Sequence, residues 1–279
     1  MVAVHGIAQQ YRGSNSLQSE WLPALRDGFS LARVPLPDEN DVAFAFYGNL
    51  FRPRGTMSLT DPPYDATDVD AWEAELLEAW WREAARVDPQ VPSPEAKTMV
   101  RTPNVVQRAL YALSNSRFFG GLTERAMIGA LKQVHLYMTD DAINAAVQAC
   151  VSSVIQHDTR VVIGHSLGSV VAYEALCTHP EWPVKRLVTL GSPLGWPNLV
   201  FDRLKPPPSN GIGVWPGALD SWINIADMGD VVALVKSLRG HFGDRVDDVL
   251  IDNGAEAHDV KSYLSAEETG RAIAGGLLT

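Results

Sequence analysis

Short β-branched and apolar runs alternate along this chain with longer stretches of helical periodicity. Such an alternation predicts a mostly parallel sheet flanked by helices. Strands are expected at Val2–Val4, Val42–Tyr47, Arg160–Ile163, Leu187–Leu190, Trp222–Ala226 and Val249–Ile251. Helices are expected at Leu17–Phe29, Asp140–Gln156, Ser169–Cys177 and from Val260 onward. We therefore expect an α/β fold in which residues 1–279 form one domain.

Two segments interrupt this alternation. Within residues 50–138, the stretch Ala71–Val87 has aromatic and apolar residues at helical spacing, and the stretch from Val105 through Met138 is apolar. Residues 195–219 carry aromatic residues around three consecutive prolines. Taken singly, these side chains would simply pack a core. Together they predict a lid or cap insertion at 50–138 and a second loop insertion at 195–219, over a lipophilic pocket.

Composition and charge narrow the classes of partner. The chain has 279 residues, is 46% hydrophobic and carries a formal net charge of −10. It can bury a large core, and without a basic cluster it is a poor candidate for nucleic-acid binding. No run reaches the roughly 18 apolar residues of a transmembrane segment. The beginning of the chain resembles a core strand rather than a signal peptide, so we expect a cytoplasmic protein. The two cysteines predict no disulfide framework.

The segment Gly164–Gly168 carries the sharpest chemical signal. Its sequence is Gly-His-Ser-Leu-Gly, preceded by a β-branched run and followed by a helix-compatible segment. This is the strand–turn–helix context that the Gly-x-Ser-x-Gly motif requires for a nucleophilic serine, here Ser166. The glycines leave room for a strained turn that presents the serine, and the helix behind it directs N–H groups toward a developing negative charge.

A nucleophilic serine needs a base and an orienting acid, which should follow it in the order acid, then histidine. Of the seven histidines, His258 follows the last predicted strand, where the base is expected, whereas His241 precedes that strand and is the weaker candidate. Asp230 and Asp227 both follow the strand Trp222–Ala226. We favour Asp230, and Asp227 remains an alternative that could instead bind backbone N–H groups of the turn.

An oxyanion hole requires two backbone donors. One is expected to be the N–H of Leu167, directly after the serine, and the other an amide of an early strand–helix loop. Val4-His5-Gly6-Ile7 follows the first strand, which points to the N–H of Ile7.

These residues resemble the α/β-hydrolase superfamily, specifically its lipase-like and GPI inositol-deacylase-like serine esterases. The resemblance rests on Val4–Ile7, Gly164–Ser169, Leu190–Leu194, Asp230–Val232 and His258. It implies hydrolysis of an ester, thioester or amide through an acyl-enzyme, with no metal and no organic cofactor.

The sequence thus predicts a serine hydrolase acting on a small-molecule or lipid-like acyl ester. The triad would be Ser166, His258 and Asp230, with Ile7 and Leu167 as oxyanion donors. A thioesterase or acyltransferase using the same residues is the alternative among enzymes. A non-catalytic ligand-binding receptor on a hydrolase scaffold is the alternative from another class.

Overall fold

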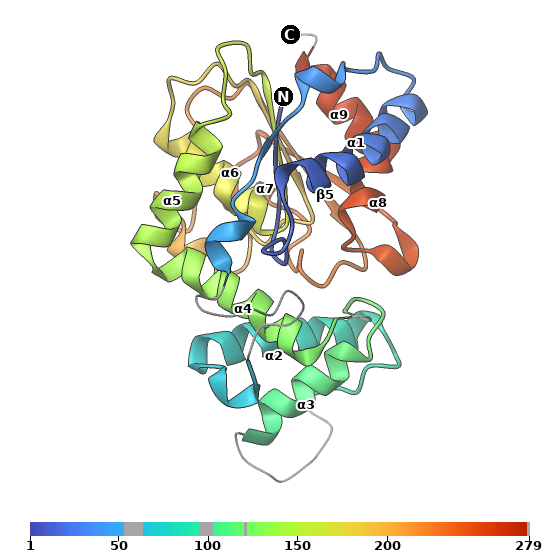
Figure 1. The fold of residues 1–279 in the computed structure, drawn as a ribbon, viewed down its shortest axis with the longest axis vertical. Coiled ribbons are helices and arrows are strands. Elements are labelled where there is room, and N and C mark those ends of the chain that lie inside the picture. The colour runs from blue at the N-terminus through green and yellow to red at the C-terminus, as the bar shows by residue number, and fades with distance from the viewer. Residues whose placement is uncertain (53–63, 95–102, 120–121, 278–279) are drawn as a thin grey trace.

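A sheet of six parallel strands forms the centre of the structure, which is a computed structural model describing residues 1–52, 64–94, 103–119 and 122–277 (Figure 1). Every neighbouring pair of its strands is parallel. Across the sheet the order is β2 (Ala43–Ala45), β1 (Val2–Val4), β3 (Val161–His165), β4 (Arg186–Leu190), β5 (Ser221–Asp227) and β6 (Val246–Ile251).

The direction of winding changes at β1, because the chain adds β2 on one side of it and β3 on the other. In open parallel sheets, ligands bind beyond the carboxyl ends of the strands at such a switch point. Ile7 follows β1 and Ser166 follows β3 directly, so both lie at this point of the sheet.

Helices cover both faces of the sheet. One face packs on α1 (Ser14–Leu31), α8 (Val260–Ser265) and α9 (Glu267–Leu277). The other packs on α5 (Asp141–Ser152) and α6 (Leu167–Thr178). The short helix α7 (Arg239–Phe242) precedes β6. Within β1, Val2 and Val4 belong to one hydrophobic core and Ala3 to the other, as the two-residue repeat of a strand requires.

Three further helices form a lobe at one end of the sheet: α2 (Ala71–Val87), α3 (Pro103–Ser114) and α4 (Glu124–Thr139) (Figure 1). The lobe belongs to the predicted insertion 50–138, parts of which lie outside the described residues. Its buried residues, among them Leu76, Trp80 and Leu131, continue the hydrophobic core beneath α5 and α6. The segment 195–219 is an irregular loop with one 3₁₀ turn at Phe201–Arg203.

The expected fold class is confirmed, with differences at the ends of elements. The helix expected at Ser169–Cys177 begins at Leu167, immediately after the turn. The apolar stretch from Val105 to Met138 holds two helices, because a turn at residues 115–119 follows the end of α3 at Ser114 and the hydroxyl of Thr123 caps α4. The C-terminal helix is likewise two helices, since Ala266 is extended.

Among the helices that the structure describes, none has both the length and the apolar character needed to cross a bilayer.

Candidate active site

Ser166 lies at a strained turn between β3 and α6. Its backbone has φ 54° and ψ −128°, a region that costs a non-glycine residue about 1–3 kcal/mol. Neighbouring glycines make the turn possible. A Cβ on Gly164 would lie 2.6 Å from the carbonyl oxygen of Gly168, and one on Gly168 would overlap the backbone of Val4 and His5. The prediction that these glycines relieve crowding at the turn is therefore confirmed.

The structure brings Ser166, His258 and Asp230 together from three separate loops. The Oγ of Ser166 lies 3.1 Å from Nε2 of His258, and Nδ1 of His258 lies 2.8 Å from Oδ2 of Asp230. In this arrangement the serine hydroxyl can donate to the imidazole while the imidazole donates to the carboxylate. A nucleophile, a base and an orienting acid require this relation.

Asp230 is fully buried, and its hydrogen bonds keep it ionised. Its other oxygen, Oδ1, accepts from the amides of Val232 and Ala233 at 2.8 and 3.2 Å. Burial by itself would raise the pKa of this carboxyl. The electrostatic interaction with His258, together with hydrogen bonds from His258 and Tyr263, outweighs burial and lowers the pKa of Asp230 to about 2.

The two alternatives from the sequence occupy other places. Asp227 ends β5, and its carboxylate accepts from the backbone amides of Gly229 and Asn253. His241 lies in α7, where its ring packs against Phe201 at 4.8 Å. In the structure Asp227 is a turn residue and His241 a packing residue, so neither is placed with Ser166.

The loop after β1 passes directly over Ser166. A Cβ on Gly6 would lie 2.8 Å from the Cβ of Ser166, so only glycine allows this approach. His5 holds the loop: its Nδ1 donates to the Gly6 carbonyl at 2.7 Å, and its Nε2 accepts from the Tyr47 amide at 3.1 Å. Neither Ile7 nor Leu167 donates its amide proton to another backbone group among the described residues. Both amides are therefore without a backbone acceptor among the described residues.

Two contacts around the site carry no sequence signal. The ring of His165 lies 4.9 Å from that of His258, and its Nε2 donates to the His258 carbonyl at 3.1 Å. Burial lowers the pKa of His165 to about 3, so its ring is neutral. The hydroxyl of Tyr263, on α8, donates to Asp230 Oδ2 at 2.8 Å. Tyr263 lies far from Asp230 along the chain, and only the fold brings them together.

Ser166 is more enclosed than the turn motif predicts, with 3% of its surface exposed. A cavity of about 490 Å³ lies over it. Its apolar lining comes mostly from the helical lobe: Trp80, Phe118, Phe119, Leu122, Met127 and Ala130. Charged residues of both signs also line the cavity, and because their side chains are 35–55% exposed they form its rim: Arg12, Glu20, Asp259 and Lys261. A second cavity of about 450 Å³ lies away from Ser166, lined by residues such as Met1, Asp41 and Arg160, and it lacks the triad.

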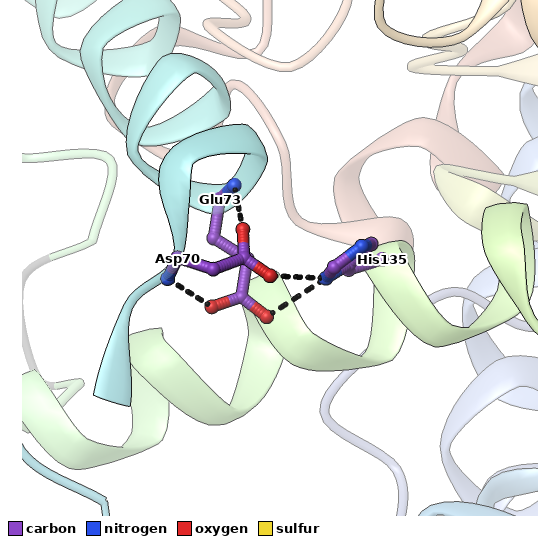
Figure 2. Close-up of side chains that lie close together, drawn as sticks. All are labelled: Asp70, Glu73 and His135. Carbon is purple, nitrogen blue, oxygen red and sulfur yellow. Dashed lines mark hydrogen bonds and ion pairs between the residues drawn. The ribbon is translucent and has the colours of Figure 1, made fainter.

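The lobe also holds a group with the side chains of a metal site: Asp70, Glu73 and His135 (Figure 2). Its atoms already have partners. Asp70 and Glu73 accept from each other's backbone amides, forming a capping box at the start of α2, and both face Nδ1 of His135 on α4 at about 3 Å. The ammonium group of Lys132 lies 3.2 Å from Glu73 and already supplies a positive charge. The group therefore fits a helix cap that ties α2 to α4 better than a metal centre.

The architecture defines the class of this protein: it has the α/β-hydrolase fold. Residues 118–205 match the family model described as the PGAP1-like alpha/beta domain. That match includes Ser166 but ends before Asp230 and His258. No curated protein and no solved structure gives a significant match to the chain.

Proposed function

We propose that this protein is a serine hydrolase that cleaves an acyl ester through a covalent acyl-enzyme. The observation that carries the proposal is the continuous contact from Ser166 Oγ to His258 to Asp230, with separations of 3.1 and 2.8 Å. The family match, which includes the strained turn of Ser166, adds support for a hydrolase.

The proposed reaction follows from these positions. Ser166 Oγ attacks the acyl carbonyl carbon while His258 Nε2 accepts the hydroxyl proton. The amides of Ile7 and Leu167 bind the oxyanion, and each such donor is typically worth about 3–4 kcal/mol of transition-state stabilisation. The imidazolium then gives its proton to the departing alcohol. A water molecule, deprotonated by His258, releases the acid and restores Ser166.

Asp230 holds the base in a productive state throughout. Because it stays ionised, it keeps the proton of His258 on Nδ1 and leaves Nε2 free to face Ser166. It also stabilises the positive imidazolium formed during the attack. His165 limits movement of the base by binding its backbone carbonyl.

We further propose that the insertion 50–138 serves as a cap of one hydrolase domain, with the loop 195–219 as a second wall of the site. Trp80 and Met127 of the lobe line the cavity over Ser166, and Trp196 of the loop lies nearby. These apolar walls favour a lipid-like or other aliphatic acyl group as the ligand. The cytoplasmic location stays a prediction.

The first test is hydrolysis of p-nitrophenyl esters, combined with labelling by a fluorophosphonate probe. Ser166→Ala should abolish labelling, and Ser166→Ala or His258→Ala should each lower kcat by at least about 10³-fold. Ser153→Ala and His241→Ala are matched controls, since Ser153 is exposed at the end of α5 and His241 lies away from Ser166.

Each outcome has a distinct meaning. Undiminished activity in Ser166→Ala would contradict the proposal. A wild-type protein that neither turns over any ester nor reacts with the probe would favour a ligand-binding receptor. Labelling without ester turnover, followed by activity on thioesters or with an added alcohol, would indicate a thioesterase or an acyltransferase.

A further inference from the structure

Trp80 lies between two hollows on the substrate side of Ser166. The first is the cavity of about 490 Å³ already described, which has an open side. The second is an inner cavity of about 20 Å³, roughly the space of one water molecule. Both are lined by Trp80 together with Ile7, Ser166 and Val232. The indole of Trp80 is therefore part of the wall that separates the two.

The inner cavity is apolar on almost every side. Besides the shared residues, it is lined by Leu76, Val134, Leu167, Pro193, Trp196 and Val200. These side chains come from the helical lobe, from the helix after Ser166 and from the loop 195–219 or its start. Its surroundings suit a hydrocarbon chain, but its present volume is too small to hold one.

Packing holds Trp80 in place. The side chain is 2% exposed, and its ring lies 5.3 Å from Phe119 and 6.5 Å from Trp196. Its indole N–H has no hydrogen-bond partner among the residues that the structure describes. The cap at Asp70 and Glu73 fixes the start of the same helix against His135 of α4 (Figure 2). Trp80 lies about three turns further along this helix, and it lines the cavity at Ser166.

The lining of the outer cavity combines buried apolar residues with partly exposed charged residues. Trp80, Phe119 and Met127 form part of the apolar wall, whereas Arg12 and Lys261 lie among the charged residues of the rim. An ester bound at Ser166 would then place its acyl chain toward Trp80 and its more polar alcohol toward the rim. The acyl chain would end at the indole of Trp80, which separates the outer cavity from the inner cavity.

Building on the proposed function, we propose that Trp80 is the specificity-determining residue for acyl-chain length. The substrate class is an ester of a polar alcohol with an aliphatic acid whose chain fits the outer cavity only. Each additional methylene group that is buried should raise kcat/KM by up to about four-fold. Beyond the length at which the chain meets Trp80, this gain should stop.

The test is a series of p-nitrophenyl esters from acetyl to palmitoyl, measured with the wild type, Trp80→Ala and Trp80→Phe. Removing the indole joins the two cavities, so the optimum should move to longer chains in Trp80→Ala and by a smaller step in Trp80→Phe. For the longest esters, kcat/KM should rise at least about ten-fold relative to the shortest, the gain of two buried methylenes or more. Trp72→Ala is the matched control: Trp72 is on the same helix, stacks on His135 at 4.9 Å and lines neither cavity.

Active variants whose chain-length profile equals that of the wild type would overturn the role of Trp80 and leave the proposed hydrolase intact. The same shift in Trp72→Ala would also overturn it, because general loosening of the lobe would then suffice. If Trp80→Ala does not fold, Trp80→Phe and labelling of the wild type with fluorophosphonates of increasing alkyl length decide the question. If none of the fluorophosphonates labels the wild-type protein, the proposed function itself would be contradicted.

Discussion

The hydroxyl of Tyr263 and the nitrogen Nδ1 of His258 meet the same oxygen of Asp230, each at 2.8 Å. Tyr263 also accepts a hydrogen bond from the backbone amide of Asp227, so it links the candidate acid to the strand that precedes it. Burial raises the pKa of Tyr263 well above its ordinary value, and the hydroxyl therefore stays a donor. We infer that Tyr263 is a positioning residue for Asp230.

Tyr263→Phe should lower kcat by about ten-fold, because a hydrogen bond to a charged group is worth about 1.5–3 kcal/mol and part of this orients the base. The acid limb of the pH–rate profile should also move to higher pH. Without the hydrogen bond from Tyr263, the carboxylate of Asp230 stabilises the protonated imidazole more strongly. Tyr173→Phe is the control: this buried tyrosine donates to the Val214 carbonyl, and its loss should leave the limb in place. A purely structural role for Tyr263 would lower stability without moving the limb.

The two aspartates of the loop after β5 should respond differently to the same substitution. Asp230→Asn should lower kcat by about 10³–10⁴-fold, because the amide would hold the wrong tautomer of His258. Asp227→Asn should keep most of the activity and lose about 1–2 kcal/mol of stability, since Asp227 only accepts from backbone amides. Steady-state kinetics and urea unfolding of both variants check this. The reverse pattern would assign the acid to Asp227.

Gly6→Ala should abolish reaction with a fluorophosphonate while the protein still folds. The added methyl group would lie 2.8 Å from Ser166 Cβ and 3.3 Å from Oγ, which displaces either the serine or the loop that carries Ile7. Gly240→Ala is the matched control, because a Cβ there meets nothing within 4 Å. Normal labelling of a folded Gly6→Ala protein would be incompatible with this packing of the loop on Ser166.

Stability should fall as the pH drops below about 6.5. Burial lowers the pKa of His165 to about 3 and that of His5 to about 4, from an ordinary value of 6.5. Between these values the unfolded chain binds protons that the folded chain excludes, so lowering the pH favours unfolding. At pH 5 each histidine should lower the free energy of unfolding by about 2 kcal/mol relative to its value at neutral pH.

Urea unfolding at several pH values measures this slope. His165→Gln should reduce the slope of unfolding free energy against pH by the amount that corresponds to about one proton. His157→Gln, which replaces an exposed ring, serves as the control. An unchanged slope in His165→Gln would mean that His165 does not stay neutral in the folded protein.

The sheet, the turn at Ser166 and the candidates Asp230 and His258 could be predicted from the sequence alone. Strand periodicity, glycine at the two positions flanking a tight turn, and the order of residues after parallel strands are all local consequences of backbone geometry. For that reason every expected strand is present, although the helix after Ser166 begins at Leu167 and not at Ser169 as expected.

Which groups face one another could not be predicted from the sequence, because it depends on the packing of distant segments. Asp227 and Asp230 lie three residues apart on one loop, and the direction of each side chain depends on the amides that the fold brings to it. Tyr263 and Trp80 reach the site through the packing of α8 and of the helical lobe, which depends on contacts between residues distant in the chain. The burial of Ser166 has the same origin, because a motif describes its own turn and not the helices that cover it.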